Sequence, residues 1–369
     1  MIYLDYAANT PVDERVLDSF VDATRKYIAN PNSSHEVGVL AKDAIDDVSK
    51  MLANYFDCDK EGIIYTSGAS ESNNLVIKGI VEYKKGKKII ISGVEHSSIV
   101  APCNYLASKG VDVSVIPLDS NGIVNLEELK KELDNDTCLV SICSVDSELG
   151  TVQPIDEIGR IVKEFNKDII FHTDATQAIG KTNIDFSNVD FLTFAPHKFF
   201  GLNGFGCLVN RYNNKLVPII HGGKSTTLFR SGTPVTANVI ALGKAFELAT
   251  HELDQRYKYI SELNKLLRDE FKKLDCIHIN SSDKSIPNTL NISLIGKDTK
   301  KIVEELNNRG VYISTTTACS LGNSPSKSVL AVTGSEELAS NTIRISMSHL
   351  VKREDIIEFI TIFEELLEK

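Results

Sequence analysis

Short apolar segments alternate along the chain with longer amphipathic ones, and this alternation limits the possible fold more than any other feature. Helical patterns such as residues 41–56 and 155–167 separate most of the apolar segments. Strands that are apolar throughout and joined by helices indicate a largely parallel sheet covered on both faces. We therefore predict an α/β fold. Its expected strands are residues 62–66, 87–92, 111–116, 138–143, 168–173, 189–194 and 204–209.

The pattern changes near residue 236, where residues 236–274 are predicted to form one long helix. A chain of 369 residues is longer than one core usually supports. We therefore predict a large domain at residues 14–250, with a mostly parallel seven-stranded sheet. A smaller α+β domain is expected from residues 1–13 and 251–369. Its expected elements are strands at 288–295 and 311–315 and helices at 299–310 and 353–369.

Charge and composition exclude several classes of function. The formal net charge of −10 argues against direct nucleic-acid binding, which normally needs a basic stripe. No stretch approaches the roughly 18 apolar residues of a membrane span. The first ten residues lack a basic segment ahead of an apolar one, so we expect a strand here, not a secretory signal. An odd number of cysteines, seven in all, without CxxC spacing fits a reducing cytoplasm better than a disulfide framework.

Cys319 differs from the other cysteines in its surroundings. It lies in STTTACSLGNSPSK, residues 314–327, among small polar residues with a glycine and a proline. In contrast, Cys138, Cys143 and Cys207 lie in apolar runs, where burial in a strand is expected. A thiol in a polar loop is expected to meet solvent, so it is either an incidental thiol or a reactive one.

Polar side chains follow several predicted strands, at the sheet edge where open parallel sheets bind ligands. The first strand leads into SGASESNN, where Ala69 and Ser70 open a helix whose backbone N–H groups can bind a phosphate. The simpler explanation of this segment is a capping box, with Ser67 or Ser70 as the cap. The other residues at strand ends are His96, Asp174, Gln177, His197 and Lys198.

Taken singly, such a histidine is usually structural and such a lysine is usually solvated, but together they fit the needs of pyridoxal 5'-phosphate. That cofactor requires a lysine for its Schiff base, an acid that keeps the ring nitrogen protonated, and an anion site for its phosphate. The protonated ring is an electron sink for the substrate's α-carbon. We expect burial and nearby cations such as His197 to help Lys198 lose its proton.

Several short motifs extend these observations over nearly the whole chain: YLDYAANTPVD, NPNSSHEVG, YTSGASESNN, EHSSIV, HTDATQAIGK, PHKFFGLNGFG, FRSGT, ACSLGNSPSK and TIRISMS. In this order and spacing the chain resembles the cysteine desulfurases, within the class V aminotransferase branch of the fold type I pyridoxal-phosphate enzymes. The resemblance implies that Lys198 forms the Schiff base and that Asp174 faces the pyridine nitrogen. It also implies that His96 stacks on the ring and moves protons, and that Cys319 takes sulfur from the substrate.

The same resemblance implies how cofactor and substrate are bound. Gln177 is expected to bond the ring's 3-oxygen, and Arg344, in TIRIS, to hold the substrate carboxylate as a bidentate partner. Ser147 occupies a position that touches cofactor and substrate in the family. The phosphate is expected to be bound by Ala69, Ser70 and His197, together with Thr233 of the neighbouring subunit in a homodimer.

The chain departs from the family pattern in several places. Ser147, in DSELG, stands where the family usually has an asparagine, and Ala195 stands where it usually has a phosphate-binding serine. The segment before RSGT lacks the usual Gln/His-Glu pair, and the loop around Cys319 has a slightly altered pattern. Because the electron sink and the nucleophile are intact, we expect the activity to be kept, whereas the sulfur acceptor stays open.

The resemblance implies a cytoplasmic enzyme that converts L-cysteine to L-alanine, with a persulfide formed on Cys319. An acceptor protein, in iron–sulfur cluster assembly or tRNA thiolation, then receives the sulfur. One alternative is a selenocysteine lyase or another β-eliminating lyase of the same branch. A different alternative is a degenerate paralogue that binds the cofactor and serves as a scaffold or regulator of sulfur assembly.

Overall fold

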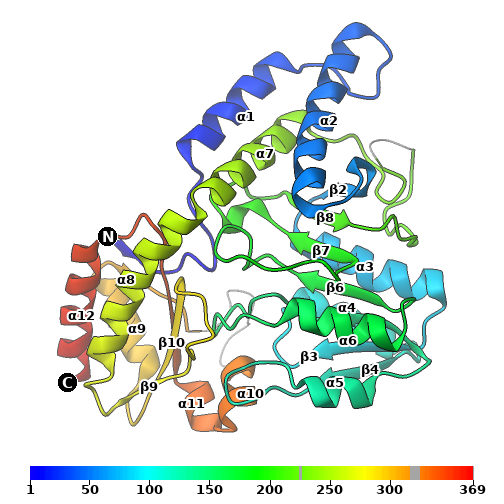
Figure 1. The fold of residues 1–369 in the computed structure, drawn as a ribbon. Coiled ribbons are helices and arrows are strands. Elements are labelled where there is room, and N and C mark those ends of the chain that lie inside the picture. Colours follow the sequence, from blue (N-terminus) through cyan, green and yellow to red (C-terminus); the bar gives the residue numbers. More distant parts are fainter. Residues whose placement is uncertain (224–226, 316–324, 369) are drawn as a thin grey trace.

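A seven-stranded sheet forms the centre of the computed structural model, which describes residues 1–223, 227–315 and 325–368 (Figure 1). Its order is β2-β8-β7-β6-β5-β3-β4; β8 is antiparallel to both of its neighbours, β2 and β7, and all other neighbouring pairs are parallel. The prediction of a mostly parallel seven-stranded sheet is confirmed. The strands are β2 (Ile63–Thr66), β3 (Lys88–Ser92), β4 (Asp112–Ile116), β5 (Thr137–Ser141), β6 (Ile170–Asp174), β7 (Phe191–Phe194) and β8 (Gly206–Asn210).

Successive residues of these strands enter two separate apolar clusters, one on each face of the sheet. Ile89 and Ile91 of β3 pack with α3 and α4, whereas Ile90 belongs to the cluster that includes α2, α6 and α7. Both faces are covered over the centre of the sheet, where β3 is buried along its whole length, whereas the edge strand β4 is largely exposed. The helices are α1 (Glu14–Lys26), α2 (Glu36–Phe56), α3 (Ala69–Lys84), α4 (Ser97–Ala107), α5 (Leu126–Glu132), α6 (Ile155–Phe165) and α7 (Thr236–His251).

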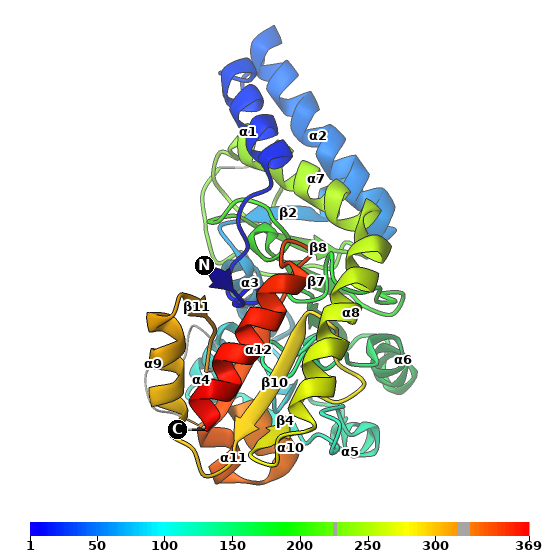
Figure 2. The same ribbon diagram turned by 90° about the vertical axis from the view of Figure 1, so that its left-hand side faces the viewer.

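A second sheet, antiparallel and three-stranded, has the order β12-β10-β9 and its own apolar cluster. Helices α8, α9 and α12 lie beside it (Figure 2). The N-terminal strand joins this part of the molecule, because β1 pairs in parallel with β11. The elements are β1 (Ile2–Tyr3), α8 (Leu253–Phe271), β9 (Ile277–Ile279), β10 (Thr289–Leu294), α9 (Thr299–Asn308), β11 (Val311–Tyr312), α10 (Lys327–Thr333), α11 (Glu336–Ser340), β12 (Thr342–Ser346) and α12 (Arg353–Leu367).

The prediction of one helix over residues 236–274 is wrong, because the chain leaves helical geometry at Glu252. This residue has φ −97° and ψ 5°, and it separates α7 from α8. Its carboxylate accepts from Arg15 of α1 at 2.6 Å and from Arg256 of α8 at 2.5 Å. The break therefore coincides with a salt bridge that joins α1 and α8 to the residue between α7 and α8, after which α8 packs against the smaller sheet.

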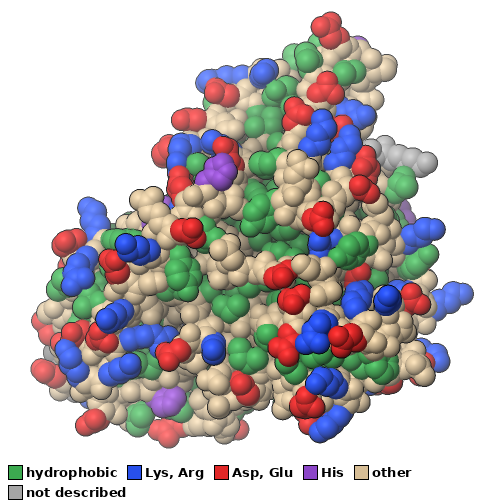
Figure 3. Space-filling view, viewed as in Figure 1, with side chains coloured by type: hydrophobic (Ala, Val, Ile, Leu, Met, Phe, Trp, Pro, Cys, Tyr) green, Lys and Arg blue, Asp and Glu red, His purple; other side chains and the backbone are tan. Residues whose placement is uncertain are grey.

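Acidic and basic side chains are interspersed over the face of the molecule shown in Figure 3. None of the described helices combines the length and the apolar character needed to cross a membrane. Cys319, on which the expected sulfur chemistry depends, lies outside the described residues.

Candidate active site

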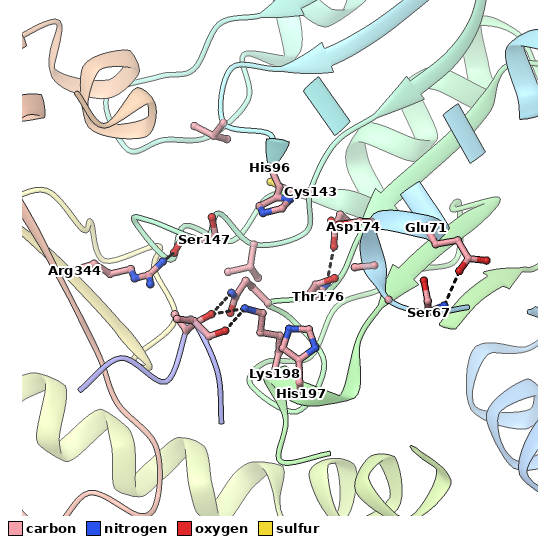
Figure 4. Close-up of a pocket in the computed structure, with 18 residues that line it drawn as sticks. Ser67, Glu71, His96, Cys143, Ser147, Asp174, Thr176, His197, Lys198 and Arg344 are labelled. Carbon is pink, nitrogen blue, oxygen red and sulfur yellow. Dashed lines mark hydrogen bonds between the residues drawn. The ribbon is translucent and has the colours of Figure 1, made fainter. Parts of the chain in front are cut away.

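A cavity of about 340 Å³ opens at the carboxyl ends of the parallel strands, where the sequence places its polar side chains (Figure 4). The residues after β2, β3, β5, β6 and β7 all reach it, as do the N-terminal segment and β12. The predicted convergence on one sheet edge is confirmed. The predicted residues that line the cavity are Ala69, Ser70, His96, Ser147, Asp174, Gln177, His197, Lys198 and Arg344.

Helix α3 begins at the cavity without a side-chain cap. Its N-cap residue is Gly68, with φ +156°, which makes no side-chain cap bond, while the Glu71 carboxylate of the first turn accepts from the backbone N–H of Ser67 at 2.8 Å. The alternative in which Ser67 or Ser70 caps the helix is therefore wrong. A Cβ on Gly206 would lie only 2.6 Å from the Gly68 backbone, so Gly206 permits this close approach. The uncapped N–H groups at Ala69 and Ser70 fit an anion such as a phosphate.

Asp174 ends β6 and is almost fully buried at the cavity wall. Its Oδ1 accepts from the backbone N–H of Thr176 at 2.9 Å, and its Oδ2 accepts from Asn73 Nδ2 at 2.8 Å. Both bonds fix the plane of the carboxylate. Because a carboxylate accepts at most about two bonds on each oxygen, these contacts leave capacity for a cationic N–H from the cavity.

His96 serves as the N-cap of α4, and this role determines where its proton resides. The backbone N–H of Ser98 donates to Nδ1 at 3.1 Å, and Ser98 Oγ lies 2.8 Å from the same nitrogen. Since a backbone N–H can only donate, the neutral ring carries its proton on Nε2. Burial lowers the pKa of His96, and Asp174 acts in the opposite direction. The ring is therefore a neutral group with one donor nitrogen free of the cap.

Lys198 ends a short 3₁₀ turn, Pro196–Lys198, that follows β7. Its Nζ donates to the carbonyls of Ala7 at 2.9 Å and Ala8 at 2.6 Å, as the dashed lines in Figure 4 show. The expectation that neighbouring His197 acts as a cation is wrong. Burial lowers the pKa of His197 to about 4, with further lowering from Lys198, so its ring is neutral near pH 7.

Arg344 reaches the opposite side of the cavity from β12 and is almost fully buried. Its Nη1 donates to the carbonyl of Ser147 at 3.0 Å, and its Nη2 donates to Asp5 at 2.8 Å. Ser147 thus lines the cavity and also supports the arginine through its backbone. The two carboxyls flanking Ser147 bond away from the cavity. Asp146 accepts from Ser328 at 3.0 Å, and Glu148 accepts from Ser326.

Among the predicted site residues that the structure describes, Thr233 is not part of this cavity, and the expected loss of a phosphate ligand at Ala195 concerns a residue outside it too. Thr233 lines a separate pocket with Arg230 and Gly204, so a role for it at the phosphate needs a second subunit. Ala195 is fully buried, without a polar side chain to offer. Cys319 lies outside the described residues, as stated above.

The sequence did not predict several residues that hold the site residues in place and take no direct part in the reaction. The Ala7 and Ala8 carbonyls that hold Lys198 are backbone groups with no sequence signal. Asn73 donates to both Asp174 and Ser98, and its place in YTSGASESNN was the available hint. Cys143 was expected to be buried in a strand, yet it follows β5 and borders the cavity.

Known proteins match this chain over nearly its full length. The sequence model of the family described as aminotransferase class-V matches residues 2–359. A cysteine desulfurase IscS of Dictyoglomus turgidum is 36% identical, covering 100% of this chain and 95% of the relative. A mitosomal cysteine desulfurase of Encephalitozoon cuniculi is 36% identical over 96% of this chain and 84% of its own length.

Solved structures are also similar to this chain over nearly its whole length. A NifS-like protein superposes with a TM-score of 0.93 and 33% identity, covering 100% of this chain and 99% of that one. The structure of SspA in complex with cysteine gives a TM-score of 0.83 and 32% identity, covering 94% of this chain and 99% of that one.

Proposed function

The chain belongs to the class V aminotransferase family, and we propose that it is a cysteine desulfurase that uses pyridoxal 5'-phosphate. The observation that carries this proposal is the set of groups around one cavity. A lysine, a buried carboxylate and an uncapped helix start lie on one side, and a guanidinium faces them from β12. Relatives named cysteine desulfurases align with this chain over nearly its whole length.

The residues present fit the cofactor. The N–H groups of Ala69 and Ser70 would bind its phosphate, Asp174 would pair with its ring nitrogen, and Lys198 would carry it covalently. When bound and protonated at the ring, the cofactor supplies an electron sink for the substrate's α-carbon. The negative charge of Asp174 would favour that protonation, and the bonds from Asn73 and Thr176 hold the carboxylate in place for it.

The other residues orient the substrate and move protons. Arg344 would bind the α-carboxylate of L-cysteine, since its guanidinium already has a fixed plane. His96 would exchange protons through Nε2, because the helix cap occupies Nδ1.

The sulfur step is a transfer between two thiols that needs no external oxidant. The thiolate of Cys319 attacks the sulfur of the substrate, an S–S bond forms, and the C–S bond breaks. Its electron pair stays with the carbon skeleton, which takes up a proton and leaves as L-alanine. The sum is L-cysteine plus a thiol giving L-alanine plus a persulfide on Cys319, which an acceptor protein then collects.

We also propose the assembly and division of the chain that the sequence predicts. Thr233 would complete the phosphate site of the partner subunit in a homodimer, and the fact that it lines a separate pocket supports this arrangement. The large domain would span residues 14–250, with residues 1–13 and 251–369 as the small domain. Separate apolar clusters in the two parts support the division.

The test is turnover of L-cysteine by the purified protein in the presence of a thiol reductant. The proposal predicts equal amounts of L-alanine and sulfide, together with a visible absorbance of bound cofactor. Lys198→Ala is the matched control and should show neither. Pyruvate and ammonia in place of alanine would contradict the proposal, because those are the products of β-elimination.

A further inference from the structure

Lys181 is a buried lysine close to the catalytic lysine that the mechanism above does not use. It lies in the turn after β6, where only 8% of its surface is exposed. Its Nζ donates to the side-chain oxygen of Gln177. It borders a small cavity that Lys198 also borders, on the side away from the main cavity. A buried ammonium is costly for stability, so its presence calls for a reason.

The lysine determines which way the Gln177 amide faces. Lys181 Nζ donates to Gln177 Oε1, so the oxygen side of the amide faces Lys181. Its Nε2 then points the other way and donates one hydrogen to the carbonyl of Ala7 at 3.0 Å. Nε2 carries a second hydrogen, and Gln177 borders the main cavity. The amide is therefore oriented as a donor toward whatever fills that cavity.

Lys181 also adds positive charge beside Lys198. The charged or titratable groups around it are Lys198, Arg344 and His197, with Arg256 and His349 across the small cavity. Burial lowers the pKa of Lys181 to about 7, and the charges of Lys198 and Arg344 lower it further in the same direction.

We propose that Lys181 is a positioning residue that orients the Gln177 amide as a hydrogen-bond donor to the ring oxygen of the bound cofactor, next to Lys198. A donor at that oxygen stabilises its negative charge, which makes the neighbouring nitrogen of Lys198 less basic. The inference rests on the proposed function only in that the cavity binds pyridoxal phosphate through Lys198. It does not depend on which substrate is turned over.

The test is a pH titration of the cofactor's visible absorbance in the holoenzyme without substrate. Lys181→Met keeps the length of the side chain but leaves Gln177 Oε1 without its donor, so the amide is free to turn. The midpoint should rise by about one pH unit. Lys181→Arg, which restores a donor, should titrate near the wild type. An unchanged midpoint in Lys181→Met would overturn the inference.

A double variant, Gln177→Leu with Lys181→Met, tests whether the lysine acts through the amide. It replaces both polar groups together, so no buried charge is left unpaired. Its midpoint should match that of Lys181→Met, because the amide has already lost its orientation there. A much larger shift in the double variant would mean that Gln177 keeps its function without Lys181, which contradicts a positioning role.

The outcomes also separate this inference from the proposed function. If Lys181→Met shifts the titration midpoint as described but the wild-type protein forms no alanine from cysteine, the proposed function is wrong and the inference is supported. A wild-type protein with no cofactor band after incubation with pyridoxal phosphate would overturn both.

Discussion

Arg344 donates to the carboxylate of Asp5 at 2.8 Å, although 339 residues separate the two in the chain. Asp5 lies just after β1, which pairs with β11, so the N-terminal segment is placed beside β12 by backbone pairing. With the Ser147 carbonyl on Nη1, this contact fixes the guanidinium plane before any substrate arrives. The arginine is therefore preorganised, which lowers the entropic cost of binding a carboxylate.

Replacing Arg344 with lysine should weaken L-cysteine binding more than it slows the chemical step. A lysine keeps the charge but loses the planar pair of donors, so KM should rise about 100-fold, with a smaller fall in kcat. Steady-state kinetics of alanine formation measure both. Asp5→Asn is the matched control, because it loosens the arginine without removing it, and KM should rise by about tenfold or less.

Lys198→Ala should abolish turnover and the visible band of bound cofactor while the protein stays folded. The side chain makes two bonds to the carbonyls of Ala7 and Ala8, and the loss of each costs roughly 1–3 kcal/mol. Absorbance spectra and thermal unfolding check the two halves of this prediction. A retained band would mean that another lysine carries the cofactor.

Asp174→Asn should leave the cofactor bound but weaken the protonation of its ring nitrogen, on which the electron sink depends. The amide oxygen can still accept from the Thr176 N–H, but its nitrogen then faces the donor Nδ2 of Asn73, so that contact is lost together with the negative charge facing the ring nitrogen. We expect kcat to fall by roughly 10²–10³-fold, with the cofactor still attached at Lys198. Alanine formation within tenfold of the wild type would show that Asp174 has no such role.

Asp146→Asn should change how stability depends on pH. Burial raises the pKa of Asp146 to about 7, with Glu148 adding to the rise. The folded protein thus holds a proton that the unfolded chain releases near pH 4, so the free energy of unfolding falls as pH rises from about 4 to 7. Asparagine can accept from the backbone and donate to Ser328, so it removes this dependence without losing the contact.

Chemical denaturation at pH 5 and pH 8 measures the effect. The loss of stability between the two should be smaller in Asp146→Asn by about 1–2 kcal/mol. Part of the slope will remain, since burial also raises the pKa of Glu95, to about 8. The exposed Asp47→Asn is the control and should leave the slope unchanged. An identical slope in Asp146→Asn would show that this carboxyl is ionised in the folded protein.

The sequence was informative wherever a local pattern determines the structure. Each predicted strand of the large sheet is present: strands buried on both faces, such as β3, give apolar runs, and the edge strand β4 shows the alternating pattern of a half-exposed strand. Given a parallel sheet, the residues after the strands must meet at one edge. That rule alone predicted that His96, Asp174 and Lys198 lie close together.

Contacts between distant segments could not be predicted in this way. The break between α7 and α8 at Glu252 involves Arg15, which is 237 residues away in the chain. The neutral state of His197 follows from burial, which no short motif reveals. Likewise, the carbonyls of Ala7 and Ala8 hold Lys198 only because β1 lies beside the smaller sheet.

The account depends most directly on Cys319 as the group that takes sulfur from L-cysteine. The measurement is alanine formed by Cys319→Ser, compared with the wild type, in a single turnover with L-cysteine. The variant keeps Lys198 and Arg344, so cysteine should still bind and change the cofactor's absorbance. A serine hydroxyl is scarcely ionised at neutral pH and is a poor acceptor of sulfur, so alanine formation should fall by at least about 100-fold. Alanine formed at the wild-type rate would contradict the account, because sulfur would then leave the substrate without Cys319.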